Sequence, residues 1–437
     1  MTRTTSNPVT FDFQEHKLPN DLHVLVLRDM SLPVVSFQIH FAAGSRNERP
    51  GLTGISHLFE HMMFRGSKEL GPEEFSRIIQ ANGGYTNAFT TTDNTSYFEN
   101  LPVDKLELAM HLETERLENL RITEENLKTE REVVRSERKY RSVNSPFGLA
   151  MEQLFAAAYH IHPYRWPVVG WDQDLRSMTL EDCREYYRIH YAPNNAVIVI
   201  VGDVEPDDAF TLVEKHFGGL SCQPEPAPIQ TVELPQRGER RLVYKKVSQV
   251  SALFAGFHIP GIADQDIFPL LALTSLLSHG RSSRFYQKFI KTGRAVEAEA
   301  DLGSPPFLTM DPGLLTIQVV ASPREDINTL EQDVWKEIDV LRSRPIEVAE
   351  LEKSKKKLRA SYLMSLQTHL FKGLVAGVYR IRAGDHRWIN RIEPSYQAVT
   401  VEGVMQAADR YLNEDNRTVV RLVPLSPEES GKWGEYE

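Results

Sequence analysis

The sequence contains very little cysteine. Only Cys183 and Cys222 occur in 437 residues, which excludes a disulfide framework and a Cys-rich zinc fold. No sequence pattern supports a single bridge between them, and a reducing compartment fits the pair at least as well.

Long hydrophobic runs are also absent. No stretch of about 18 apolar residues occurs, so no segment is expected to span a membrane. Residues 1–10 contain no apolar core of the length that a secretory signal needs. The cytoplasm is therefore the expected compartment, while a targeting peptide upstream of Met1 stays an open alternative.

An excess of basic charge is the third thing missing. The formal net charge is -10 and the pI is about 5.8. A protein that binds nucleic acid normally carries a basic face, so no nucleic-acid partner is expected at this net charge. The simplest interpretation of the acidic excess is an ordinary solvated surface. The alternative is an acidic chamber that attracts basic peptides.

What is present is typical of a globular protein with two or three domains. Hydrophobic residues make up 41% and charged residues 25% of the sequence. Alternating patterns predict strands at 21–28 and 33–41, and helical spacing predicts a helix over 54–64. A charged helical stretch over 103–141 is expected to break near 121–123, with Thr123 as the N-cap of its second part.

The second half of the chain resembles the first. Thr179-Leu-Glu181 and the strand that starts at Asn195 are echoed 221 residues later by Thr400-Val-Glu402 and the strand that starts at Asn416. A period this long indicates domain duplication. We therefore expect an α+β fold with two homologous domains, each a mostly antiparallel sheet packed with helices. The expected boundaries are 1–220, a Pro-rich linker at 221–240, and 241–437.

The sequence His57-Leu-Phe-Glu-His61 carries the chemistry of the first half. Two histidines four residues apart stack on one face of a helix, from which both imidazoles can reach one metal ion. Glu60 borders that face and can take a proton from water without binding the metal. The alternative is an ordinary helix with two surface histidines. The apolar neighbours indicate instead that this face is half-buried, where unpartnered histidines would cost free energy.

A catalytic zinc needs a third protein ligand and one open position. The best donors lie on the acidic stretch 129–137. Glu130 and Glu137 are almost two helical turns apart and point the same way, whereas Glu132 lies on another side. Spacing alone does not choose between Glu130 and Glu137, and either could belong to a solvated helix face.

His-x-x-Glu-His resembles the inverted zinc-peptidase motif of the pitrilysin/insulysin family, the inverzincins. The resemblance extends over nearly the whole chain and is closest to the short two-domain branch with the mitochondrial processing peptidase β subunit and bacterial heterodimeric relatives. It implies one Zn²⁺ per chain, held by His57, His61 and Glu137, with Glu60 as the catalytic base. Glu130 is then a residue that supports the site from behind.

The resemblance also implies a peptide-binding strand. Asn82-Gly-Gly-Tyr-Thr-Asn-Ala88 is similar to the family's strand that pairs with bound peptide. The expected substrate-binding residues share this strand: Gly84, Tyr85, Thr86, Asn87 and Ala88.

The second half departs from the family in one respect. Active sites of the family are completed by an Arg and, seven residues later, a Tyr, which follow a Ser-Ser-Arg stretch. Counted from Ser282-Ser283-Arg284, these positions hold Ile290 and Glu297, and no other Arg-x6-Tyr occurs within 241–437. Neither residue can polarise a substrate carbonyl as the pair would.

A second copy of the chain would lack the pair as well. The resemblance therefore implies a heterodimer with a homologue that carries Arg and Tyr, in which each chain forms half of a clamshell around a chamber for peptides. The expected activity is that of a zinc metalloendopeptidase on peptides or unfolded segments. Two alternatives are a presequence-processing subunit and a non-catalytic structural homologue, and the intact zinc motif argues against the latter.

Overall fold

The computed structural model describes residues 10–145, 147–426 and 429. Residues 1–9, on which the expectation about a leader partly rests, lie outside them. The chain forms two compact units. Unit 1 comprises residues 1–135, 167–230 and 362–394, and unit 2 comprises 136–166, 231–361 and 395–437. The predicted boundaries 1–220, 221–240 and 241–437 refer to the repeat along the sequence, not to these spatial units, and they stay a prediction.

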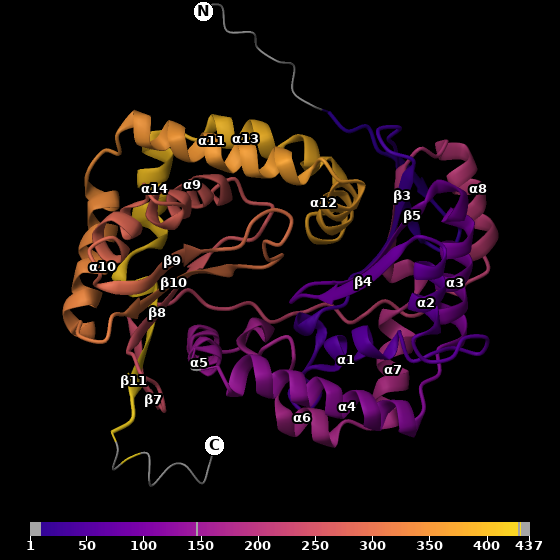
Figure 1. The fold of residues 1–437 in the computed structure, drawn as a ribbon, viewed down its shortest axis with the longest axis horizontal. Helices are drawn as coiled ribbons and strands as arrows, with labels where there is room; N and C mark the ends of the chain where they lie inside the picture. Colours follow the sequence, from indigo (N-terminus) through magenta and orange to yellow (C-terminus); the bar gives the residue numbers. More distant parts are fainter. Residues whose placement is uncertain (1–9, 146, 427–428, 430–437) are drawn as a thin grey trace, which may run out of the picture. The chain divides into compact units, whose positions relative to one another are not determined.

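Unit 1 is built on a six-stranded sheet in the order β1-β2-β6-β3-β5-β4. Figure 1 labels β3, β5 and β4 of this sheet. All neighbouring strands are antiparallel except β2 and β6, which are parallel. The strands are β1 (Gln14–Lys17), β2 (His23–Arg28), β3 (Val34–Phe41), β4 (Tyr85–Thr90), β5 (Thr95–Pro102) and β6 (Ala196–Gly202). The strands expected at 21–28 and 33–41 correspond to β2 and β3.

One face of this sheet is apolar. Phe37, Ile39 and Phe41 of β3 belong to a continuous hydrophobic core with side chains from several helices. The helices of this part are α1 (Ile55–Met62), α2 (Glu74–Ala81), α3 (Leu106–Asn119), α4 (Glu124–Arg138), α6 (Asp172–Ser177), α7 (Leu180–His190) and α8 (Pro206–Phe217). The expected break at 121–123 is confirmed, because α3 ends before it and the Asn126 amide donates to Thr123 Oγ1.

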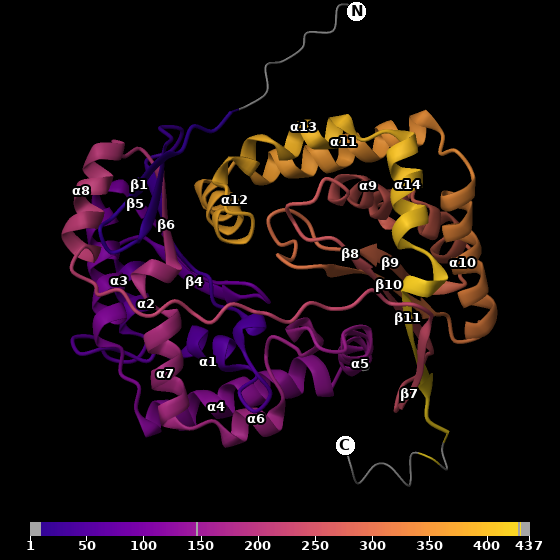
Figure 2. The same ribbon diagram turned by 180° about the vertical axis from the view of Figure 1, so that it is seen from behind.

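On the other face of the unit 1 sheet, β3 carries polar side chains beside the valines of β6. Gln38 and His40 point to this face and are fully buried. The helix α12 (His369–Arg382), more than 300 residues from β3 in sequence, covers this face beside β3 and β6 (Figure 2). Gln38 Nε2 donates to the Leu370 carbonyl at 2.9 Å, and Arg382 donates to Asn94 Oδ1. Polar contacts therefore hold α12 on the sheet.

Unit 2 contains a five-stranded sheet in the order β7-β11-β8-β10-β9. Its strands are β7 (Arg240–Lys246), β8 (Ala252–Ile259), β9 (Ala295–Asp301), β10 (Gly313–Ala321) and β11 (Arg417–Pro424). The remaining helices are α5 (Gly148–Ala158), α9 (Ile267–Ser278), α10 (Ile327–Ser343), α11 (Val348–Ser365), α13 (Ile392–Ala398) and α14 (Val401–Tyr411). The division between the units falls inside the continuous helices α4, α11 and α13.

The two sheets share one topology. β2-β6-β3-β5-β4 corresponds strand for strand to β7-β11-β8-β10-β9, including the single parallel pair in each. Thr179 and Thr400 cap the matching helices α7 and α14. The expected α+β fold of two homologous, mostly antiparallel domains is confirmed.

Unit 2 covers the corresponding face of its sheet with α5. This helix packs on β8 and β11, and its Ala150 and Leu154 join an apolar cluster with Phe254 and Leu422. Residues 136–166 of the first half thus complete unit 2, and residues 362–394 of the second half complete unit 1. One helix from each half of the sequence thus covers the sheet of the other half.

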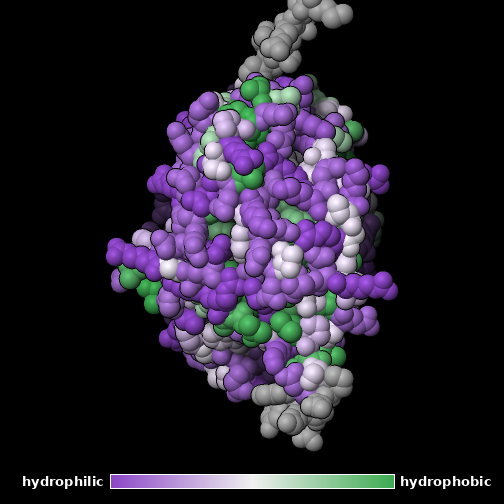
Figure 3. Space-filling view, turned by 90° about the vertical axis from the view of Figure 1, so that its left-hand side faces the viewer, coloured by the Kyte–Doolittle hydropathy of each residue, from purple (hydrophilic) through white to green (hydrophobic). Residues whose placement is uncertain are grey.

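The surface fits the sequence expectations. The face drawn in Figure 3 is mostly hydrophilic, with small scattered hydrophobic groups, as is usual for a folded protein. Among the described residues, no helix combines the length and the hydropathy needed to cross a bilayer. Cys183 and Cys222 are both free thiols, and burial raises the pKa of Cys183 to about 12.

Candidate metal centre

The helix α1 begins at a tight backbone contact. Gly54 has φ +91°, and a Cβ there would lie 2.6 Å from the Val169 carbonyl oxygen. The start of α1 therefore requires glycine, both for its left-handed conformation and for the close approach of the 167–170 loop.

Glu48 caps this helix. Its side chain accepts hydrogen bonds from the Gly54 amide at 2.8 Å and the Ser56 amide at 2.9 Å, two groups that an α-helix leaves without partners. Burial raises the pKa of Glu48 to about 8, although the two amides pull it down. Because the N-cap residue Gly54 has no side chain, Glu48 takes the role that a Ser or Asp N-cap would have.

The apolar side of α1 fixes its rotation. Leu58, Phe59 and Met62 are completely buried, and Phe59 stacks on Tyr186 and Tyr187 with ring centroids 5.6 Å apart in each case. Helical periodicity then places His57 and His61 together on another side. The buried face thus decides where the two imidazoles lie.

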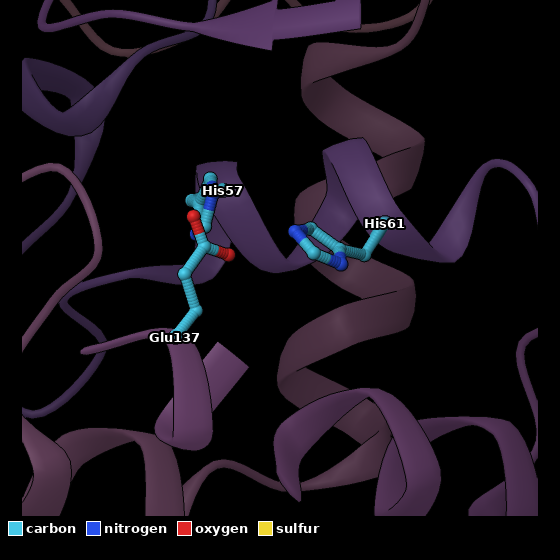
Figure 4. Close-up of side chains that lie close together, drawn as sticks. All are labelled: His57, His61 and Glu137. Carbon is cyan, nitrogen blue, oxygen red and sulfur yellow. The ribbon is translucent and has the colours of Figure 1, made fainter. Parts of the chain in front are cut away.

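His57, His61 and Glu137 come together (Figure 4). Each offers one ligand atom, and these three atoms lie within 4.8 Å of one another. The two imidazole rings have centroids 4.9 Å apart at an interplanar angle of 74°. Glu137 is on α4, the same continuous helix that carries Glu130. All three residues are ones that the sequence singled out.

Glu130 holds α4 in place behind this group. Its carboxylate is 1% exposed, lies 3.4 Å from His61 Nδ1 and pairs with Arg65 Nε. Burial opposes the charge, but the hydrogen bonds with His61 and Arg65 keep the pKa of Glu130 below its usual value. A carboxylate on the far nitrogen of a histidine is the usual support of a zinc ligand, because it fixes the tautomer and the ring orientation.

The donor set fits zinc. Two imidazoles and one carboxylate are the ligands of several catalytic zinc sites, which keep their fourth position open. Bonds of about 2.0–2.2 Å in a tetrahedron put ligand atoms about 3.5 Å apart, so small side-chain rotations close the set around an ion. His57 is 7% exposed, whereas His61 and Glu137 are intermediate, which leaves the group accessible from one side.

Glu60 is the remaining candidate on α1. It is half-buried and lies between the two histidines in sequence, one residue before His61. The edge of the sheet is nearby, because α1 packs beside β4. A carboxylate at this place can exchange a proton with water next to a metal ion.

The stretch with the predicted substrate-binding residues forms an edge strand. Tyr85, Thr86, Asn87 and Ala88 lie in β4, directly after Gly84. β4 pairs with β5 and is the last strand of the sheet order, so its other side meets no strand among the described residues. Tyr85 is 52% exposed, and an open edge of this kind can accept an added strand.

Ile290 and Glu297, at the positions of the missing Arg and Tyr, lie in unit 2. Ile290 ends the π-helical segment η6 (Tyr286–Ile290), and Glu297 is in β9. Glu297 accepts a hydrogen bond from Gln318 Nε2 at 2.7 Å. Burial, with the nearby Glu299, raises the pKa of Glu297. An ionised carboxylate only accepts hydrogen bonds, so it cannot polarise a carbonyl by donating one.

Two buried charged groups near the site were missed by sequence reasoning. One is Glu48. The other is Arg116, which is 1% exposed, donates to Glu113 and lies 4.2 Å from the ring centroid of Phe75 and 4.6 Å from that of Tyr97. Both stand in charged stretches that look solvated. The three-residue spacing of Glu113 and Arg116 does indicate an ion pair along a helix. It does not indicate burial, because the same spacing is common on exposed helices.

Two family models match the chain. The model "Insulinase (Peptidase family M16)" matches residues 23–170, and the model "Peptidase M16 inactive domain" matches residues 177–358. The first contains the His57–His61 group and Glu137, and the second contains Ile290 and Glu297.

Curated relatives resemble the chain over most of its length. Zinc protease PqqE of Helicobacter pylori is 28% identical over 413 residues, which are 93% of this chain and 92% of the relative. The uncharacterized zinc protease YmxG of Bacillus subtilis is 26% identical over 397 residues, 91% of this chain and 95% of the relative.

Solved structures have the same fold. The crystal structure of a protease from Helicobacter pylori, 28% identical, superposes with a TM-score of 0.90 over 95% of this chain and 100% of that chain. An M16-like peptidase from Alicyclobacillus acidocaldarius, 23% identical, has a TM-score of 0.80 over 96% of this chain and 100% of its own. With both family models in tandem, full-length relatives named zinc proteases and the His57–His61 helix in place, the chain belongs to peptidase family M16, the insulinase family.

Proposed function

We propose that the chain is the zinc-bearing subunit of a heterodimeric metalloendopeptidase that hydrolyses peptides or unfolded segments. The observation that carries the proposal is the group of His57, His61 and Glu137, whose ligand atoms lie within 4.8 Å of one another. His57, His61 and Glu137 would hold one Zn²⁺. When bound, the ion supplies a Lewis acid for the scissile carbonyl and lowers the pKa of water to about 7.

Glu60 provides the proton transfer in this proposal. Its carboxylate takes a proton from the attacking water and then gives it to the nitrogen of the leaving amine. Glu130 keeps the ring of His61 oriented through the 3.4 Å contact with Nδ1, which would leave Nε2 to bind the ion.

The substrate would bind as an added strand on the outer edge of β4. Gly84, Tyr85, Thr86, Asn87 and Ala88 would contact an extended peptide through main-chain groups, which suits a peptidase that accepts varied sequences. Since α1 packs beside β4, a peptide on this edge would pass near Glu60. Peptides and unfolded segments offer a free extended main chain for such pairing.

The partner is needed in this proposal because the positions of the carbonyl-polarising pair hold Ile290 and Glu297. A homologue with Arg and Tyr at the positions of Ile290 and Glu297 would supply hydrogen-bond donors for the oxyanion of the transition state. Removal of one such donor typically costs about 10²–10³ in kcat. A cytoplasmic location stays a prediction.

The role of Glu60 is tested by Glu60→Gln. We expect the variant to keep one zinc per chain by metal analysis and to lose peptide hydrolysis by at least about 10²-fold in the presence of the partner. The matched control is Glu132→Gln on α4, where Glu132 pairs with Arg135 on the surface. Full activity of Glu60→Gln would remove Glu60 from the mechanism.

A further inference from the structure

Unit 2 contains a polar pocket between the end of α9 and α11. Its volume is about 270 Å³, and Ser275, Ser283, Lys353 and Lys357 are among its lining residues. The two helices meet beside it, because Ser354 Oγ of α11 donates to the Ala272 carbonyl of α9 at 3.1 Å.

This pocket is the counterpart of the candidate metal centre in the repeat. A shift of 218 residues carries β3 (Val34–Phe41) onto β8 (Ala252–Ile259), and their partners β5 and β10 follow in the same register. The same shift carries His57 onto Ser275 and His61 onto His279. Glu130 is the seventh residue of α4, and Ser354 is the seventh residue of α11.

The counterpart has donors where the metal centre has ligands. Ser275 is 2% and Ser283 is 3% exposed, and neither hydroxyl oxygen has a hydrogen-bond partner among the described residues. Buried hydroxyls nearly always have hydrogen-bond partners, since a buried polar group without a hydrogen bond costs about 1–3 kcal/mol. Two such groups lining one pocket indicate an occupant that accepts hydrogen bonds.

The charges at the pocket have the sign that an anion requires. Lys353 and Lys357 stand one turn apart on α11, and Lys357 Nζ donates to the His279 carbonyl at 2.6 Å. Burial lowers the pKa of Lys357, and so does the charge of Lys353. The turn at Gly280, with φ +81°, lies close to the Lys357 ammonium: a Cβ at this position would be 3.4 Å from Nζ. Like charges at this spacing repel each other unless an anion bridges them.

The lining also contains two carboxylates, Glu347 and Glu350. Glu350 is already neutralised, because Arg284 donates to both of its oxygens at 2.8 and 2.9 Å. Glu347 is exposed to solvent and therefore contributes a screened charge.

We propose that this pocket binds a tetrahedral oxyanion of the phosphate class, with Ser275, Ser283, Lys353 and Lys357 as donors. Four oxygens can accept from several converging donors at once, whereas a carboxylate has two. The repeat would thus have kept a binding site in both halves and inverted the charge of its ligand from cation to anion. This inference does not depend on peptidase activity.

Isothermal titration of the zinc-loaded chain with inorganic phosphate, at constant ionic strength set with chloride, tests the proposal. Saturable one-to-one binding is expected, and Lys357→Gln and Ser275→Ala should each weaken it, by about tenfold for the lysine. Lys356→Gln, on the same helix but not lining the pocket, should bind as the wild type does. Circular dichroism melting checks that each variant is folded.

Two further arms identify the anion and its place. His61→Ala should keep the binding, which separates this pocket from phosphate on the metal. Tighter binding of glycerol phosphate than of inorganic phosphate would assign the pocket to a phosphomonoester, and the reverse order to free phosphate. No saturable binding to the wild type, or equal weakening by Lys356→Gln and Lys357→Gln, would overturn the proposal.

Discussion

The two halves of this chain place the same pair of helices against the same kind of sheet and give them different chemistry. In the first half, α1 and α4 bring His57, His61 and Glu137 together. In the second half, the positions of the two histidines hold Ser275 on α9 and His279 directly after that helix. The fold therefore supplies the place for a site, and a few side chains decide what binds there.

The helices that the halves exchange differ in the same way. α5 lies on an apolar cluster in unit 2, whereas α12 in unit 1 covers the buried polar side chains of β3, such as Gln38 and His40, beside the valines of β6. Packing against apolar side chains is sensitive to lost side-chain volume. Packing against buried polar side chains is sensitive to added volume and to the charge of the buried groups.

The largest effect should come from breaking the metal centre on one side of the comparison only. His61→Ala should lower the zinc content from one per chain to near zero, because it removes one of the three proposed protein ligands. His279→Ala, the change at the repeat counterpart, should leave one zinc per chain. Metal analysis after gel filtration measures both. Equal zinc loss in the two variants would mean that the halves are not specialised.

The exchanged helices should respond to opposite changes. Leu154→Ala removes a fully buried side chain from the apolar cluster under α5 and should lower the free energy of unfolding by about 2–5 kcal/mol. Gly377→Ala on α12 puts a Cβ 2.3 Å from His40 Cδ2 and should cost about 1–3 kcal/mol.

Urea unfolding followed by circular dichroism measures both effects. Leu234→Ala, at a side chain that is 73% exposed, is the control for the lost volume. Gly219→Ala, whose Cβ would meet nothing within 4 Å, is the control for the added methyl. A neutral Gly377→Ala would show that α12 does not pack tightly on His40 of β3.

Much of the site followed from the sequence, for identifiable physical reasons. The four-residue spacing places His57 and His61 on the same face of a helix, since residues i and i+4 always lie one above the other there. Glu130 and Glu137 could not be told apart by spacing, because both point the same way. Their different neighbours, Arg65 and His61 for Glu130 and the two imidazoles for Glu137, are tertiary contacts.

The parts that could not be predicted depend on contacts far apart in sequence. Nothing around residues 369–382 indicates that α12 covers β3 and β6, because its polar contacts lie on residues such as Gln38 and Asn94. Arg116 and Glu48 look like surface charges in the sequence and are buried in the structure. Periodicity reports which face is apolar and does not report a buried ion pair.

Support of the metal ligands should matter less than the ligands themselves. Glu130→Gln keeps the shape of the side chain but removes its charge from His61 and Arg65. Zinc affinity should fall by about 10–100-fold, as measured by competition with a chelator. Ser354→Ala, at the counterpart on α11, should leave the affinity unchanged. If Glu130→Gln bound zinc as tightly as the wild type, Glu130 would not support the site.

The smallest effect at neutral pH concerns a histidine pair of the repeat, His40 and His258. Burial lowers the pKa of His40 to about 3, so between pH 6.5 and 3 the folded chain binds fewer protons than the unfolded chain. The free energy of unfolding should therefore fall on acidification through that window, by up to about 1.4 kcal/mol per pH unit for this group.

His40→Gln should flatten this slope and should leave the pH dependence of the free energy of unfolding above pH 7 unchanged. His258→Gln should flatten it less, because the hydrogen bond from its ring to the Ala158 carbonyl raises the pKa against burial. Urea midpoints from pH 7 to 4 measure the slopes. An unchanged slope in His40→Gln would show that His40 does not titrate with unfolding.

The central claim is that this chain supplies the metal and the base of a peptidase and that a homologous partner supplies the rest. The most direct measurement is the initial rate of hydrolysis of an unstructured peptide by a fixed amount of zinc-loaded chain, titrated with a homologue that carries Arg and Tyr. We predict a negligible rate for the chain alone and a rise that saturates at one partner per chain. A chain that cleaves the peptide as fast alone as in the mixture would contradict the account.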